Sequence, residues 1–176
     1  MVGAMRELAP FRLDDFATAP FHWERTAVIV ASPEAVFAEL GDPSLWFALM
    51  SRSVWKSGAT SGVGAIREVT LRVFGSFREV MLAWDEPDAH GVGRVAFTMT
   101  AVDSPLVERM AEEMRIAPHA DGVAFTYGVI AEPSRIGRPI QPVLRAILRG
   151  LFGSSVRGLA KRTSWSEGRV RATHGA

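Results

Sequence analysis

The stretch that decides the fold runs from Ile140 to Trp165 and reads IQPVLRAILRGLFGSSVRGLAKRTSW. Its apolar residues recur at steps of three and four, which places them on one face of a helix. As a helix the stretch would be about 39 Å long, enough to lie across a whole sheet. The apolar stripe consists of Ile140, Leu144, Ile147, Leu148, Leu151, Phe152, Val156 and Leu159, and a basic stripe of Arg145, Arg149, Arg157 and Lys161 accompanies it.

Most of the remaining chain carries strand patterns separated by short turns. The segment 106–117 has helix-forming residues, but Pro105 before it and the Asp121-Gly122 turn after it predict a strand. Short turns imply antiparallel neighbours. Strands are therefore expected over 21–31, 51–56, 65–73, 76–84, 91–101, 106–117 and 123–131.

Two short helices are expected after the first strand. Ser32 as N-cap, followed by Pro33 and Glu34, predicts a helix over 33–40. The second follows Gly41-Asp42-Pro43 and has Leu45, Trp46, Leu49 and Met50 as its apolar residues. The expected order of elements is thus β-α-α-β-β-β-β-β-β-α.

The overall composition restricts the class of protein. The chain has 176 residues, 48% hydrophobic and 22% charged, which predicts one globular domain. The expected division is an arm at 1–20, a domain at 21–168 and a tail at 169–176. A net charge of +1 argues against nucleic acid as a partner. No signal peptide or membrane span is recognisable, so a cytoplasmic protein without integral membrane contact is expected.

Several motifs of known chemistry are incomplete. Gly62-x-Gly64 lacks the third glycine and the helix of a dinucleotide site, and predicts a structural turn. The histidines are far apart and cysteine is absent, so neither a metal site nor a cofactor is expected. There is also no G-x-S-x-G serine elbow.

Several motifs follow one another in a recognisable order: Ala31-Ser32-Pro33-Glu34-Ala35-Val36-Phe37, Asp42-Pro43-Ser44-Leu45-Trp46, Gly62-Val63-Gly64-Ala65-Ile66-Arg67, Glu79, Trp84-Asp85-Glu86-Pro87 and the final helix. These motifs and the order of elements resemble the START-like superfamily, in its polyketide cyclase/dehydrase and lipid-transport branch. The resemblance covers about residues 21–166. It implies an α+β helix-grip fold, in which a curved antiparallel sheet wraps around the long C-terminal helix and leaves an internal apolar cavity. It does not imply a reaction, because the fold hosts many functions.

Charged residues on the strands are the candidates for chemistry. Strand alternation puts Glu108 and Glu112 on the methionine-bearing face of 106–116, where a carboxylate must be paired or have a raised pKa. Arg67 could pair with one of these glutamates or hold an anionic head group. Alternatively, Glu108 lies at the solvated rim of the cavity and Arg67 pairs with an acid of a neighbouring strand such as Glu79. The hydroxyl of Tyr127 could orient a ligand or lie at the core edge.

These residues support three hypotheses about the function of the protein. The first is a protein that binds a lipid or polyketide-like molecule, with transient membrane contact left open and a monomeric or homodimeric state. The second is an aromatase/cyclase-like dehydratase that uses Arg67, Glu108 or Glu112, and Tyr127. The third is an interaction partner with a vestigial cavity. The expected ligand-binding residues are Arg67, Val69, Phe97, Met99, Met110, Glu112, Met114, Phe125, Tyr127, Ile147, Leu148 and Leu151. The polar candidates are scattered in the sequence, which favours binding.

Overall fold

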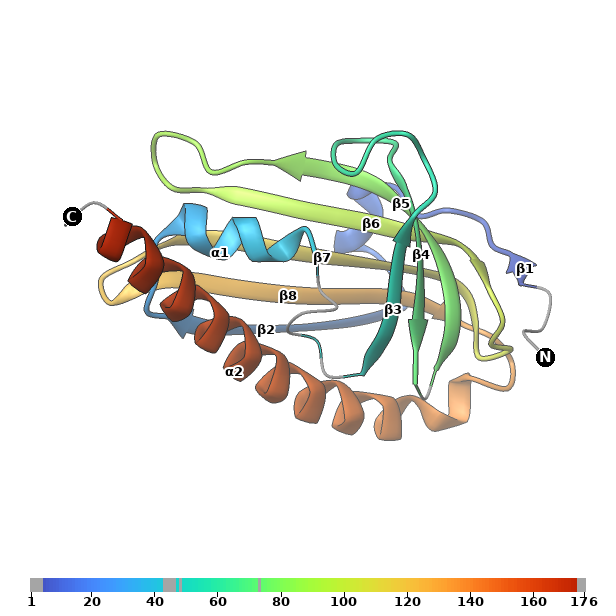
Figure 1. Cartoon of the computed structure of the whole chain (residues 1–176). Coiled ribbons are helices and arrows are strands. Elements are labelled where there is room, and N and C mark those ends of the chain that lie inside the picture. The colour runs from blue at the N-terminus through green and yellow to red at the C-terminus, as the bar shows by residue number, and fades with distance from the viewer. Residues whose placement is uncertain (1–4, 43–46, 48, 73, 174–176) are drawn as a thin grey trace.

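A curved antiparallel sheet and one long helix form most of the chain (Figure 1). The computed structural model describes residues 5–42, 47, 49–72 and 74–173. Its elements are β1 (Arg6–Glu7), η1 (Leu13–Ala17), β2 (Phe21–Ile29), α1 (Pro33–Leu40), β3 (Met50–Trp55), β4 (Ile66–Leu71), β5 (Gly75–Asp85), β6 (Gly93–Val102), β7 (Val107–His119), β8 (Gly122–Pro133), η3 (Arg138–Ile140) and α2 (Gln141–Thr173).

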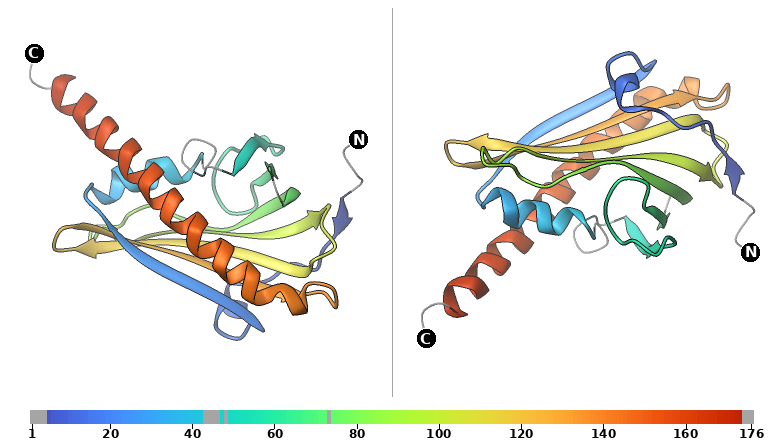
Figure 2. Two further views of the ribbon diagram at one scale, coloured as in Figure 1. Left: turned by 90° about the horizontal axis from the view of Figure 1, so that it is seen from below. Right: turned by 90° about the horizontal axis from the view of Figure 1, so that it is seen from above.

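The sheet follows the expected helix-grip topology. Its strand order is β2-β8-β7-β6-β5-β4-β3, and every pairing is antiparallel. Figure 2 shows α2 crossing the strands diagonally, with α1 on the same side of the sheet. The predicted α+β helix-grip fold is therefore confirmed.

The strand that the turn residues predicted over 106–117 is present as β7, which spans Val107–His119. β7 pairs with β6 on one side and with β8 on the other, so its backbone groups are satisfied by ladders on both edges. Those ladders outweigh the helix propensity of its glutamates and methionines.

The helix α1 has the predicted start and end. The hydroxyl of Ser32 accepts a hydrogen bond from the Ala35 backbone N–H at 3.2 Å, and Pro33 occupies the first turn. Farther along, Arg162 Nε of α2 donates to Glu39 Oε2 at 2.8 Å. This ion pair holds the far part of α2 against α1.

Two segments differ from the expected order. The predicted second helix falls largely on residues 43–46 and 48, which lie outside the described residues; Met50, expected in that helix, instead begins β3. The short strand β1 was not predicted, and it pairs with the end of β6. After it, Phe11 is buried on the outer face of the sheet with Ala111 and Ile130. The proposed domain boundaries themselves stay predictions.

The helix α2 begins one residue later than predicted and continues to Thr173. Leu148 and Leu159 are buried, as their stripe predicts. Ile140 and Ile147 of the same stripe are exposed instead. The reason is geometric: the first turns of α2 lie beyond the packed core, at the edge of a cavity described below.

A tight turn joins β4 to β5 at that same end of the sheet. Gly75 has a φ of 83°, and a Cβ there would lie 1.9 Å from Asp103 Oδ1. That oxygen accepts the Ser76 backbone N–H at 2.9 Å, so the β4–β5 turn is tied to the end of β6. Only glycine permits this conformation and this close approach.

Candidate functional site

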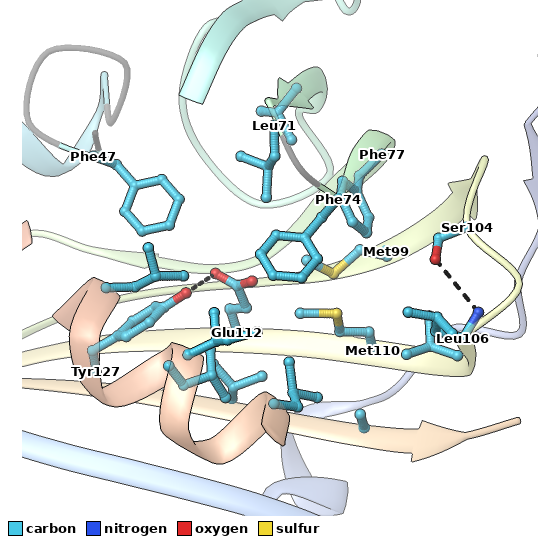
Figure 3. A pocket seen from close by; sticks show the side chains of 18 of the residues that line it. Phe47, Leu71, Phe74, Phe77, Met99, Ser104, Leu106, Met110, Glu112 and Tyr127 are labelled. Atoms are coloured by element: carbon cyan, nitrogen blue, oxygen red, sulfur yellow. Dashed lines mark hydrogen bonds between the residues drawn. The ribbon is translucent and has the colours of Figure 1, made fainter. Parts of the chain in front are cut away.

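An internal cavity of about 160 Å³ lies between the sheet and α2. It is lined mainly by aromatic, methionine and branched aliphatic side chains (Figure 3). All twelve residues expected to bind ligand line it: Arg67, Val69, Phe97, Met99, Met110, Glu112, Met114, Phe125, Tyr127, Ile147, Leu148 and Leu151. The periodicity of the strands and of the final helix was therefore sufficient to predict that these residues face one cavity. Their role in binding a ligand stays a prediction.

Other lining residues were not predicted as part of the site. Phe77 and Glu79 share one face of β5, so alternation along that strand could have found them. Phe152 could have been found from the stripe of α2. Phe47 and Phe74 lie in connecting segments, where no periodic signal exists.

A buried ion pair lies at the sheet side of the cavity. Arg67 and Glu79 face each other on β4 and β5, and their side chains are 1% and 3% exposed. Arg67 Nε and Nη2 donate to Glu79 Oε2 at 2.9 and 2.7 Å. The guanidinium also lies 5.2 Å from the Trp55 ring and 5.3 Å from the Phe97 ring. Of the roles considered for Arg67, pairing with Glu79 is the one that the structure shows.

Beside this pair, Glu112 of β7 and Tyr127 of β8 point toward one another (Figure 3). The Tyr127 hydroxyl donates to Glu112 Oε2 at 2.5 Å. Both side chains are only partly covered by protein atoms, because they face the cavity. Among the ion pairs of the described residues, none includes Glu112.

The surroundings of Glu112 favour its protonated form. Burial away from bulk water and the nearby negative charge of Glu79 raise the pKa of Glu112 to about 7, although Tyr127 and Arg67 oppose the shift. Burial, and then the Glu112 carboxylate, raise the pKa of Tyr127 well above its usual value. Glu112 can therefore give or take a proton near neutral pH.

These polar residues form one cluster within an apolar cavity. Glu112 interacts electrostatically with both Glu79 and Arg67, and Phe97 opposite Glu112 contacts the Arg67 guanidinium. The sequence did not predict that these residues lie together, because the spacing of residues along the chain does not reveal which strands are neighbours in the sheet. The sheet brings Arg67, Glu79, Glu112 and Tyr127 together.

Glu108 does not belong to this cluster, so its predicted inward direction is wrong. A β-bulge between Val107 and Arg109 shifts the register against β8. The extra residue reverses the alternation at that point, so Val107 and Met110 both line the cavity while Glu108 points outward. There Glu108, 54% exposed, pairs with Arg6 of β1 at 3.1 Å.

Ser155 of α2 is a further polar group at the cavity. Ser155 lines the cavity, and the residue is only 4% exposed to solvent. Its Oγ has no hydrogen-bond partner among the described residues. A buried hydroxyl without a partner costs about 1–3 kcal/mol. A ligand oxygen or nitrogen at this point would remove that cost.

Other candidate chemistries find no support in the described part of the chain. It contains no group of three or more His, Cys, Asp or Glu residues that could hold a metal ion. Gly62 and Gly64 have φ values of 88° and 84° and form a turn that β4 follows, so no phosphate cradle is present. No helix of the described residues has both the length and the hydropathy that a bilayer span requires.

The fold and the site together define a helix-grip protein with a largely apolar internal cavity. The chain belongs to the polyketide cyclase/dehydrase and lipid transport family, whose model matches residues 20–163. It is 26% identical over 149 residues to the uncharacterized protein Rv2574 of Mycobacterium tuberculosis, covering 83% of this chain and 86% of that protein. A Mycobacterium bovis protein, Mb2604, matches to the same extent.

Solved structures show the same fold at low sequence identity. TTHA0849 from Thermus thermophilus superposes with a TM-score of 0.64 at 14% identity, covering 83% of this chain and 99% of that one. A Thermobifida fusca protein gives a TM-score of 0.62 at 20% identity, covering 81% and 92%. Ara h 8.0201 gives 0.57 at 13% identity, covering 80% and 98%. These likenesses support the fold alone.

Proposed function

We propose that this protein binds a hydrophobic small molecule in the internal cavity, with an oxygen of the ligand at the Glu112–Tyr127 pair. The observation that carries the proposal is the polar cluster placed inside an otherwise apolar cavity. Small-molecule sites combine these two features, since apolar walls supply affinity and a few polar groups fix orientation. A lipid or polyketide-like compound has this chemistry.

The cavity volume restricts how the ligand is held. A space of about 160 Å³ holds roughly one aromatic ring or a short chain. The methionines Met99 and Met110 can change conformation to fit an irregular shape. We therefore expect the ligand to place one ring or chain end inside, while a longer remainder leaves past the first turns of α2.

Polar groups at two places would orient such a molecule. Protonated Glu112 can donate a hydrogen bond to a carbonyl oxygen, and ionised Glu112 can accept one from a hydroxyl. Ser155 on α2 offers a second polar group, a hydroxyl that has no hydrogen-bond partner in the described part of the chain. A ligand with two oxygen functions would satisfy both, and a pure hydrocarbon would satisfy neither.

The first test fills the cavity. N-phenyl-1-naphthylamine, a neutral dye that fluoresces in apolar sites, is expected to bind with about micromolar affinity, near −8 kcal/mol. Met110→Trp adds bulk at a side chain that lines the cavity (Figure 3), so dye affinity should fall by about tenfold or more. Fluorescence titration measures both values.

Val30→Trp is the matched control for that test. Val30 is 78% exposed and does not line the cavity, so this variant should keep the dye affinity of the parent protein. Equal affinity in the Met110 and Val30 variants would place the dye elsewhere and contradict the proposal. Circular dichroism checks that each variant remains folded.

A second candidate function is a cofactor-independent cyclase or dehydratase. The observation that favours it is Glu112, whose pKa of about 7 suits proton transfer near neutral pH. In the dehydration of a β-hydroxy ketone, Glu112 as carboxylate would take the proton next to the carbonyl. Tyr127, which donates to Glu112, would orient the carboxylate. As the carbon–carbon double bond forms, the bond to the β-hydroxyl would break, and the departing hydroxide would take the proton from Glu112 and leave as water, which restores the carboxylate.

Glu112→Gln separates these two functions. Glutamine keeps the size and can accept from Tyr127, but it cannot exchange a proton. An enzyme should lose about a hundredfold in turnover of a β-hydroxy ketone, followed by the absorbance of the enone product. A carrier should show no turnover in either form and dye affinity within about threefold. The cytoplasmic location and the oligomeric state stay predictions.

A further inference from the structure

The exposed apolar side chains gather at one end of the molecule. Of the eight large apolar residues that are exposed in the described chain, four lie in the segment of residues 135–149, which we call the mouth segment. Ile136 and Val143 are 64% and 59% exposed, and Ile140 and Ile147 are 38% and 36% exposed. Single exposed apolar residues need no explanation, but a group of them does.

This group marks the entrance of the cavity. Ile140, Val143 and Ile147 both line the cavity and reach solvent. Their spacing of three and four puts them on one face of η3 and the first turns of α2, which follow one another directly. Figure 1 places these turns beside the ends of β4 and β5, at the opposite end of α2 from the C-terminus. The mouth segment therefore combines the entrance with an apolar surface.

The same segment is positively charged. Residues 133–166 contain no aspartate or glutamate. Arg135, Arg138 and Arg149 are exposed, and none of them has an ion-pair partner among the described residues. Arg145 is engaged differently, because it donates to the His22 carbonyl at 3.0 Å and covers the Phe21 ring. Three arginines thus remain available around the four apolar residues.

We infer that the mouth segment docks the protein onto an anionic lipid bilayer. Apolar side chains that enter the interface, surrounded by arginines that meet anionic head groups, are the two contributions that bind peripheral proteins to membranes. A second copy of this chain fits less well, since a twofold contact would bring the same arginines against each other. Exchange of a ligand between bilayer and cavity would follow from this placement, and that part rests on the proposed function.

The test uses the whole chain and lipid vesicles. Co-sedimentation is expected with phosphatidylcholine vesicles that contain phosphatidylglycerol, and not with pure phosphatidylcholine vesicles. Ile136→Ser should weaken the vesicle affinity about tenfold. Arg138→Gln should weaken it about fivefold and reduce its dependence on salt.

Each variant has a matched control outside the mouth segment. Val30→Ser removes a valine that is 78% exposed, and Arg157→Gln removes an exposed charge farther along α2. Both controls should keep the vesicle affinity within about twofold. Equal binding to neutral vesicles, or equal loss in variant and control, would overturn the inference. So would a dimer, seen by analytical ultracentrifugation, that Ile136→Ser dissociates.

Dye binding in solution separates this inference from the proposed function. Neither Ile136 nor Arg138 lines the cavity, so the dye titration reports on the cavity in both variants. Dye binding without vesicle binding would reject docking and keep the proposed function. Vesicle binding without dye binding would keep docking and reject the proposed function.

Discussion

Replacing Glu79 by leucine is expected to lower the free energy of unfolding by about 3–5 kcal/mol. The variant leaves the Arg67 guanidinium, 1% exposed, without its carboxylate. Arginine cannot release its proton inside a protein, so the charge stays buried and unpaired. For a chain of this length the melting temperature should fall by roughly 10 °C, which calorimetry measures.

Three further variants identify the cause of that loss. Arg67→Met should lower the free energy of unfolding less at acidic pH than at neutral pH. Burial already raises the pKa of Glu79, so its unpaired carboxyl can take up a proton at acidic pH. The double variant Arg67→Met/Glu79→Leu removes both charges and should recover most of the stability. Glu108→Leu breaks an exposed pair and should cost at most about 1 kcal/mol. A Glu79→Leu protein no less stable than Glu108→Leu would contradict the buried pair.

Glu112→Gln is expected to stabilise the protein at pH 8 by about 3 kcal/mol. Burial raises the pKa of Glu112 in the folded protein to about 7, above its ordinary value of 4.5, so the folded protein binds the proton more tightly than the unfolded chain. The stability from this proton is fully present below about pH 4.5 and is lost as the pH rises through about 7. Above that pH the parent protein carries a buried charge, which glutamine lacks.

Urea denaturation at several pH values measures this effect. The difference between Glu112→Gln and the parent protein should shrink toward zero as the pH falls to about 4.5. Glu108→Gln, which removes one carboxylate from the exposed side of β7, is the matched control and should change stability by less than about 1 kcal/mol. A Glu112→Gln protein that is no more stable than its parent at pH 8 would show that Glu112 is well solvated.

Local patterns were sufficient for most of the fold. Ser32-Pro33 predicted the start of α1. Pro105 before the segment and the Asp121-Gly122 turn after it predicted that β7 is a strand. Both predictions were possible because caps and turns depend on only a few neighbouring residues. β1 was missed because two residues carry no periodicity. The expected second helix could not be compared, because it falls largely outside the described residues.

The candidate site was predictable only in part. Period-two alternation put Arg67, Glu112 and Tyr127 on the cavity face of their strands, and the structure agrees. The same rule failed at Glu108, because a bulge adds one residue to β7 and so reverses which face of the sheet the side chains before it point toward. No pattern in the sequence marks the position of that bulge.

The sequence alone determined most of the strands, the helices α1 and α2, the antiparallel order and the apolar stripe of α2, since each depends on residues that are near one another in the chain. Tertiary structure decided which polar groups meet. Arg67 and Glu79 pair because β4 and β5 are neighbours, and Glu112 approaches Tyr127 because β7 and β8 are neighbours. The raised pKa of Glu112 follows from burial beside Glu79, which only the assembled sheet and α2 produce, because desolvation depends on atoms that lie far apart in sequence.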